Sequence, residues 1–441
     1  MSSLLITNAR IVTLDDSDQF FDTGSIYVED SKIVAVGNLD TDQYAPDRTI
    51  DANNRLVMPG LIIAHHHLYS TFARGFSPPG PPATNFDENL RFLWWKLDAA
   101  LDTDDVYYSA LLALMDAAQH GCTTVIDHHA SPSCTDECLD WVERAFTDVG
   151  LSGCLCYEVS DRNRDGDGIE ENARYIRKCR DAGDEQMTAL FGMHASMTVS
   201  DETLERCAAI GNELEAGFHV HAAEDLVDVE RTRQRHGKRV IDRFHDFGIT
   251  GEKTIFVHGT HLEPGEMDLL NETGSMLVTN PESNMNNGLP VSPVLDFLDR
   301  GVLVGIGTDG MSSHVISQAR ALYMHVRTLR GDPTLAFGEA CTILLNNNRE
   351  ICNRLFAEPR GQLAAGQLAD IVIYDYVPFT PVNETTFLGH LLFGLSFARV
   401  NTTIARGKVV VDDGDIPNLN ETAIRADCEE RAQAIWSRIR A

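Results

Sequence analysis

Two histidines separated by one residue follow an apolar stretch near the start of the chain. The segment PGLIIAHHH spans residues 59–67 and has the composition of a buried β-strand. Strand side chains alternate between two faces, so His65 and His67 leave the strand on the same side, close enough to bind one ion. His66 points to the opposite face and is interpreted as structural. Neutral imidazoles are ligands that Zn²⁺ and Fe²⁺ accept, so the pair indicates a metal site.

Three further groups of the same chemistry end later apolar segments. His221 lies in HVHAAE (219–224), His258 ends TIFVH, and Asp309 lies in GTDG. One of His219 and His221 should face the ion while the other packs behind it. His258 could bind the ion, or could hydrogen-bond a water molecule or a substrate oxygen. An ion held by histidines and a carboxylate, with one position open, activates water, so the pattern predicts a metal-dependent hydrolase.

Glu224 follows His221 by three residues and is expected in the loop above the ion. A carboxylate beside the nucleophilic water and the substrate is placed for general acid and base catalysis. The alternative is a surface glutamate in an acidic stretch with Asp225, Asp228 and Glu230. The fourth predicted strand offers His194 where a carboxylated lysine would bridge two ions, which favours a single metal.

Other polar side chains near the predicted strand ends are candidate substrate contacts, and each could instead be structural. They are Arg74, Arg162, His194 and Asn284, with His128 and His129. The proline-rich stretch 76–92 follows the predicted strand that carries His65 and His67, and it is either a lid over the site or a rigid surface loop. Trp94 and Trp95 could form an aromatic wall or anchor a helix in the core.

Eight short apolar segments alternate with helical stretches between residues 59 and 360. The predicted strands are 61–67, 122–129, 152–160, 187–195, 216–224, 253–259, 275–280 and 302–310. Eight strand–helix units in about 300 residues fit a (β/α)₈ barrel, whose active sites lie at the carboxyl ends of the strands. The polar residues cluster at those ends. Helices are expected over 104–120, 203–215 and 421–440.

The two ends of the chain have a different pattern, with short strands separated by turn residues. Residues 1–58 and 361–441 are each too small to cover a sheet face alone, so we expect them to pair into one small β-sandwich. The predicted domains are therefore the N-terminal half of this sandwich, the catalytic barrel over 59–360, and the C-terminal half with a terminal helix.

Composition excludes several classes of protein. The 441 residues include 36 basic and 66 acidic side chains, a net charge of −30, which argues against nucleic-acid binding. Only six of the basic residues are lysines; a high-salt cytoplasm or a GC-rich genome would each produce this bias. We find no apolar run of about 18 residues and no signal peptide. The ten cysteines form no CxxC pair, so we expect free thiols and a cytoplasmic protein that does not bind membranes.

Longer segments around these motifs complete the pattern. They read PGLIIAHHHLYSTFARG, LWWKLDAALD, GCTTVIDHHASP, SDRN, HVHAAEDLVDV, ESNMNN and GTDG. Together they resemble the amidohydrolase superfamily, in the branch of purine, pyrimidine and S-adenosylhomocysteine deaminases and triazine hydrolases, and within it the SsnA group of aminohydrolases. The resemblance covers nearly the whole chain. It implies a distorted (β/α)₈ barrel with a β-sandwich from both termini, and a homodimer.

The resemblance also implies roles for individual residues. His65, His67, His221 and Asp309 correspond to the ligands of one Zn²⁺ or Fe²⁺ ion. Glu224 and His258 correspond to the proton-shuttling positions, and His194 to a substrate contact. Three departures, at Thr279, at Ser196 after His194-Ala195, and at Ser313-His314-Val315, surround the expected substrate and leave its ring system open.

The expected reaction is hydrolytic deamination of a small nitrogen heterocycle of purine, pyrimidine or pterin type, with release of ammonia. Asp309 would act with Glu224 and His258 in catalysis. The alternative keeps the activated water but opens a cyclic amide or ureide, or displaces another leaving group as a triazine hydrolase does. A third possibility is a metal- or ligand-binding protein without catalytic activity on the same barrel.

Overall fold

The computed structural model describes residues 2–164, 166–184 and 186–440, and its central part contains two parallel sheets. The first consists of β6 (Leu61–His66), β7 (Cys122–Asp127), β8 (Ser152–Leu155) and β9 (Met187–Ala189). The second consists of β10 (Phe191–Ala195), β11 (Phe218–Ala222), β12 (Ile255–His258), β13 (Met276–Thr279) and β14 (Val304–Ile306). Each predicted strand contains one of these elements, except the fourth, which is divided into β9 and β10.

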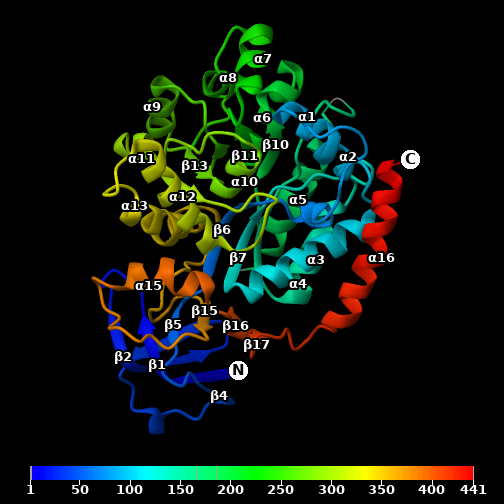
Figure 1. Ribbon diagram of the computed structural model, residues 1–441. Helices are drawn as coiled ribbons and strands as arrows, with labels where there is room; N and C mark the ends of the chain where they lie inside the picture. The colour runs from blue at the N-terminus through cyan, green and yellow to red at the C-terminus, as the bar shows by residue number, and fades with distance from the viewer. Residues whose placement is uncertain (1, 165, 185, 441) are drawn as a thin grey trace.

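Backbone contacts join the edges of these two sheets. Parallel bridges link His66 with Asp309 and Val159 with Met193, and the Thr308 N–H donates to the His65 carbonyl over 2.9 Å. Gly307 permits this approach, because a Cβ at that position would lie 2.5 Å from the His65 carbonyl oxygen. Helices surround the strands (Figure 1). The arrangement is of the TIM-barrel type, and it brings the carboxyl ends of β6, β11, β12 and β14 together.

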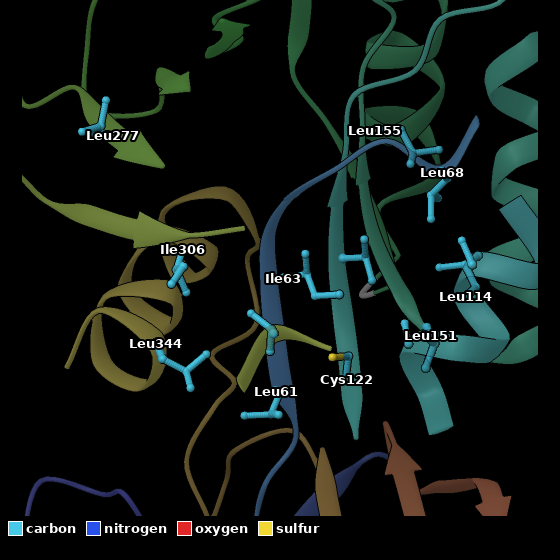
Figure 2. Packing of buried hydrophobic residues seen from close by; sticks show 14 of the residues in the cluster. Leu61, Ile63, Leu68, Leu114, Cys122, Leu151, Leu155, Leu277, Ile306 and Leu344 are labelled. Atoms are coloured by element: carbon cyan, nitrogen blue, oxygen red, sulfur yellow. The ribbon is translucent and has the colours of Figure 1, made fainter. Parts of the chain in front are cut away.

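Alternating apolar side chains of the strands build two cores. Ile62 and Ala64 of β6 join a fully buried cluster with Ile126 and Val257, which come from both parallel sheets. The adjacent side chains Leu61 and Ile63 belong to the larger cluster that packs against the helices (Figure 2). Strands that are buried on both faces read as continuous apolar runs. This is why the strand signals in the sequence were strong.

Helices occupy most of the chain between the strands. They are α1 (Phe86–Asn89), α2 (Trp95–Asp98), α3 (Thr103–Gln119), α4 (Cys138–Val149), α5 (Ile169–Ala182), α6 (Asp201–Glu213), α7 (Leu226–His236), α8 (Val240–Asp246), α9 (Pro264–Thr273), α10 (Pro281–Asn286), α11 (Val294–Asp299), α12 (Val315–Arg330), α13 (Phe337–Thr342), α14 (Asn348–Leu355), α15 (Phe387–Phe393) and α16 (Glu421–Arg440). The three helices predicted from the sequence correspond to α3, α6 and α16.

Local capping fixes the starts of two of these helices. α3 begins with a capping box of Asp102 and Asp105, and Ser200 Oγ accepts the Thr203 N–H at the start of α6.

Both ends of the chain contribute to one further sheet of eight strands. Its strands are β1 (Ser3–Val12), β2 (Phe20–Glu29), β3 (Lys32–Gly37), β4 (Arg48–Asp51), β5 (Leu56–Pro59), β15 (Ile371–Tyr374), β16 (Val400–Ala405) and β17 (Lys408–Asp412). β5 joins the two halves, because it pairs with β1 and with β15 (Figure 1). A two-layer sandwich remains a prediction. Within the described residues, no helix has the length and apolarity needed to cross a membrane.

Candidate metal centre and the cavity above it

Four predicted ligands converge at the carboxyl ends of the barrel strands. The Nε2 atoms of His67 and His221 lie 3.2 Å apart, and Asp309 Oδ1 lies 3.2 Å from His67 Nε2 and 3.8 Å from His65 Nε2. Zn–N bonds of about 2.0–2.1 Å in a tetrahedron separate ligand atoms by roughly 3.3–3.4 Å. The observed spacings therefore fit a single ion held by these side chains.

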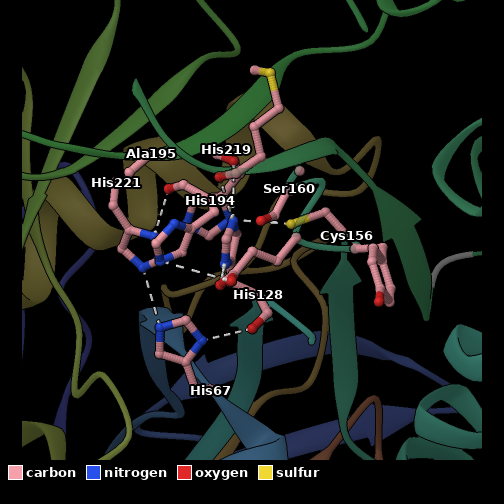
Figure 3. Close-up of polar contacts among 12 residues, drawn as sticks. His67, His128, Cys156, Ser160, His194, Ala195, His219 and His221 are labelled. Carbon is pink, nitrogen blue, oxygen red and sulfur yellow. Dashed lines mark hydrogen bonds and ion pairs between the residues drawn. The ribbon is translucent and has the colours of Figure 1, made fainter. Parts of the chain in front are cut away.

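Hydrogen bonds to the far side of each imidazole orient the ligating nitrogens. His67 Nδ1–H donates to the His128 carbonyl over 2.6 Å, and His221 Nδ1–H donates to the His194 carbonyl over 2.8 Å (Figure 3). Each ring then presents an unprotonated Nε2, because a hydrogen bond from the other ring nitrogen fixes the tautomer, as it does for histidines in metal sites. His65 Nδ1 contacts His219 Nε2 at 2.9 Å, while His65 Nε2 is buried with no hydrogen-bond partner among the described residues. A bound ion would satisfy that nitrogen.

The electrostatics of the cluster agree with a cation site. Burial and the neighbouring histidines lower the pKa of His65 and of His221, which keeps both rings neutral as ligands must be. Burial would also lower the pKa of His67, but the contact with Asp309 raises it to about 9.

His258 has a different hydrogen-bond pattern from the three candidate ligand rings. The Asn284 amide donates to His258 Nδ1 over 3.2 Å, so the ring proton resides on Nε2. That Nε2 lies 3.4 Å from Glu224 Oε2 and 3.9 Å from Asp309 Oδ2. His258 therefore presents an N–H group toward the two carboxylates. Burial, followed by the negative charge of Asp309, raises the pKa of Glu224 well above its ordinary value.

The backbone is strained at two of these positions. His258 has φ of +72° and Asp309 has φ of +52°, a left-handed conformation that residues with a Cβ seldom adopt. Such strain persists where the surrounding structure enforces it, and it concentrates at functional sites. Ser283 Oγ donates to Asp309 Oδ2 over 2.5 Å and fixes that carboxylate.

A cavity opens directly above the candidate ligands. Its polar lining includes His67, Glu158, His194, His221, Glu224, His258, Ser283 and Asp309, and its apolar lining includes Tyr69, Phe86, Leu90, Trp94, Trp95 and Met311. The proline-rich stretch 76–92 thus contributes to the wall through Phe86 and Leu90. Both tryptophans also line the cavity, as an aromatic wall would, and a π-helical turn over Leu90–Trp94 carries one of them.

The predicted substrate contacts are distributed unevenly around this cavity. His194 lines it. Arg162 and Asn284 do not line it; Arg162 is bonded to Asp98 and Glu158, and Asn284 positions His258. Arg74 is 69 % exposed and lies in a neighbouring cavity beside Asp116. Long arginine side chains following a strand have several directions open to them, so their sequence position alone did not reveal which cavity they reach.

Two residues of the site went unrecognised in the sequence. Glu158 follows β8 and lines the cavity, and Ser283 holds Asp309. Glu158 lies within the predicted third strand, at its carboxyl end, where barrel active sites gather their side chains. That position was the signal for Glu158. Ser283 lies in α10, within the segment ESNMNN, but nothing in that segment indicated that its hydroxyl group would hold Asp309.

Comparison with known proteins gives concordant results. The model of the amidohydrolase family matches residues 56–410. A 5'-deoxyadenosine deaminase of Methanosarcina barkeri is 27 % identical over 100 % of both chains, and a 5-methylthioadenosine/S-adenosylhomocysteine deaminase of Desulfitobacterium hafniense is 27 % identical over 99 % of both. Among solved structures, a zinc-bound adenosine deaminase from Xanthomonas campestris is similar in fold, with a TM-score of 0.87 at 21 % identity over 99 % of both chains. A zinc-bound atrazine chlorohydrolase from Arthrobacter aurescens has a TM-score of 0.80 at 19 % identity, over 97 % of this chain and 100 % of that one.

Proposed function

This chain belongs to the amidohydrolase family, and from that premise we propose that it is a metal-dependent deaminase. It is a hydrolase of carbon–nitrogen bonds other than peptide bonds, and it replaces an exocyclic amine of a nitrogen heterocycle with oxygen. The observation that carries the proposal is Glu224, a carboxyl group with raised pKa that lies beside His258 above the ligand cluster. The deaminase names of the full-length relatives agree with it.

We assign the metal to His65, His67, His221 and Asp309, as one Zn²⁺ or Fe²⁺ ion. Their spacing and the unpartnered His65 Nε2 support this set. Zinc is named in the similar adenosine deaminase structure, and both metals accept three imidazoles and a carboxylate. When bound, such an ion supplies a Lewis acid that makes water nucleophilic at neutral pH.

Asp309 and Glu224 carry out the proton transfers of the proposed reaction, and His258 orients the water. Asp309 accepts a proton from the attacking water, and the His258 Nε2–H orients that water toward the ring carbon. Glu224, protonated because it is buried beside Asp309, donates its proton to the adjacent ring nitrogen. Asp309 then passes the proton that it took from the water to the amine, which leaves as ammonia. The new hydroxyl group returns a proton to Glu224 as it becomes the ring carbonyl. His194, at the cavity wall, contacts the substrate.

Removal and restoration of the metal tests this assignment. Dialysis against a chelator should abolish ammonia release together with bound metal, and one equivalent of Zn²⁺ or Fe²⁺ per chain should restore both. Metal content is measured by elemental analysis on the same samples. Full turnover by protein that holds less than a tenth of an equivalent would refute the metal-dependent mechanism.

A further inference from the structure

Glu158 is a second carboxylate in the same cavity, and the reaction described above does not use it. It follows β8 and its side chain is only 3 % exposed. It lines the cavity together with Glu224, His194 and Trp95. A buried carboxylate at a catalytic cavity needs partners that offset its loss of hydration.

Side chains of the protein fill only part of the hydrogen-bond acceptor capacity of the Glu158 carboxylate. Arg162 Nη2 donates to Glu158 Oε1 over 2.9 Å. His128 Nδ1 lies 3.4 Å from Oε2, longer than an ordinary N–H···O bond, and His194 Nε2 lies 3.8 Å from Oε1. A carboxylate accepts about four hydrogen bonds. Glu158 therefore keeps acceptor capacity within the cavity, which a ligand with N–H groups would use.

The charge of Glu158 is fixed by its surroundings. The Arg162 guanidinium bridges Glu158 and the buried Asp98, with 3.1 Å to Asp98 Oδ2. The same guanidinium lies over the Trp95 ring at 4.9 Å, so it holds the carboxylate and the aromatic wall in one unit. Burial alone would raise the pKa of Glu158, but His194, His128 and Arg162 outweigh it and lower the pKa. Glu224 shows the opposite shift.

The cavity thus presents a proton donor and a hydrogen-bond acceptor to a flat ligand. Trp94, Trp95, Tyr69 and Phe86 supply aromatic surface against which a planar ring can pack. Glu224 donates to a ring nitrogen that lacks a proton. Glu158 can only accept, so it favours a ring that carries an N–H group.

We propose that Glu158 determines substrate specificity by accepting a hydrogen bond from a ring N–H, and that the substrate is an aminated lactam ring of guanine, isocytosine or pterin type. This inference rests on the deaminase function proposed above. An adenine nucleoside has no ring N–H, and its only base N–H groups belong to the leaving amine. The names of the relatives refer to adenine nucleosides, so our proposal predicts a different substrate class from the one that those names suggest.

The test compares ammonia release from guanine, isocytosine and pterin with release from adenosine and 5'-deoxyadenosine. The metal-loaded wild-type protein should favour the lactam rings. Glu158→Gln keeps the side-chain shape but loses the charge, and should lower kcat/KM for lactams about 10- to 100-fold, the range for a hydrogen bond to a charged group. Glu230→Gln is the matched control, because it makes the same change at an exposed glutamate of α7 outside the cavity lining, and it should leave kcat/KM unchanged on every ring.

A substrate variant makes the test independent of how Glu158→Gln folds. Wild-type protein should turn over guanine but lose at least tenfold in kcat/KM on 1-methylguanine, which lacks the N–H beside the carbonyl. Preference for adenine nucleosides, or equal losses on every ring in Glu158→Gln, would overturn the role of Glu158 and leave the deaminase proposal standing. Metal-loaded protein that releases ammonia from no aminated ring would overturn both proposals.

Discussion

At the scale of single residues, the environments of two carboxylates support the acid and base roles that we propose for them. Glu224 and Asp309 are both carboxylates that contact His258, yet their pKa values shift in opposite directions. Burial acts on both. Asp309 also receives hydrogen bonds from His67 and Ser283, which favour its ionised form, whereas Glu224 faces the negative charge of Asp309. Opposed shifts of this kind mark one group as proton donor and the other as acceptor.

Replacement of Glu224 tests the donor role. Glu224→Gln keeps the size of the side chain but cannot transfer a proton, so kcat should fall about 100- to 10,000-fold. Metal content should stay at the wild-type level, because Glu224 is absent from the proposed ligand set. Steady-state kinetics and elemental analysis on the same preparation measure both quantities.

Glu230→Gln is the control for that substitution, since Glu230 is an exposed glutamate on α7. It should leave kcat unchanged. Near-normal kcat in Glu224→Gln would remove Glu224 from the mechanism, and loss of metal would reassign it to the ligand shell.

The spacing of the ligands could be read from the sequence because strand geometry is regular. Alternation along a strand predicted that His65 and His67 share a side, and that one of His219 and His221 packs behind the other, as the contact between His65 and His219 now shows. The place of Glu158 in the site could not be predicted in this way, because it depends on which strands are neighbours. Its partners His128, Arg162 and His194 come from three separate segments.

At the scale of elements, a buried aspartate anchors the loops that carry the site. Asp228 of α7 accepts the N–H of Met197, which precedes α6, and the N–H of Ala223, which precedes Glu224. Burial raises its pKa to about 6, although these hydrogen bonds act in the opposite direction. Asp228 thus ties the start of α7 to the loops after β10 and β11.

This aspartate makes stability depend on pH with a defined sign. An unfolded aspartate has a pKa near about 3.9, so between roughly pH 4 and 6 the folded chain binds more protons at Asp228 than the unfolded chain does. Its contribution to stability is therefore present below pH 4 and lost as the pH rises through 6. Asp228→Asn does not titrate, so its melting temperature relative to wild type should rise between pH 4.5 and 7.

Thermal unfolding across that range measures the effect, and Asp242→Asn serves as the control because Asp242 is an exposed aspartate on the neighbouring α8. A constant difference between Asp228→Asn and wild type at every pH would contradict the argument. Asparagine has one hydrogen-bond acceptor fewer than aspartate, which lowers the melting temperature of Asp228→Asn by the same amount at every pH. The change with pH in the difference from wild type is therefore the quantity that tests the argument.

At the scale of the whole molecule, the barrel was predictable because each strand is apolar and short. The eight segments matched the observed elements in order, apart from the break between β9 and β10. The pairing of β5 with both β1 and β15 explains how strands from the two ends meet, since β5 leads directly into β6 of the barrel. We propose the domain boundaries near 58 and 360 on the basis of the strand pattern in the sequence, and a homodimer because the family resemblance implies one.

The net charge of −30 bears on the conditions under which the protein is assayed. Self-repulsion among surface carboxylates destabilises a compact chain and is screened by salt. Activity should therefore be measured at both low and molar salt. A circular dichroism spectrum at each salt concentration then distinguishes a folded but inactive sample from an unfolded one.

The most direct test of the account is product analysis of the metal-loaded protein with aminated purines, pyrimidines, pterins and triazines, at low and molar salt. Deamination predicts one ammonia per substrate consumed and a product in which an oxygen replaces the amine on an intact ring, seen by mass spectrometry. An opened ring, or loss of a leaving group other than ammonia, would contradict the central claim. So would folded, metal-bound protein that leaves every ring unchanged.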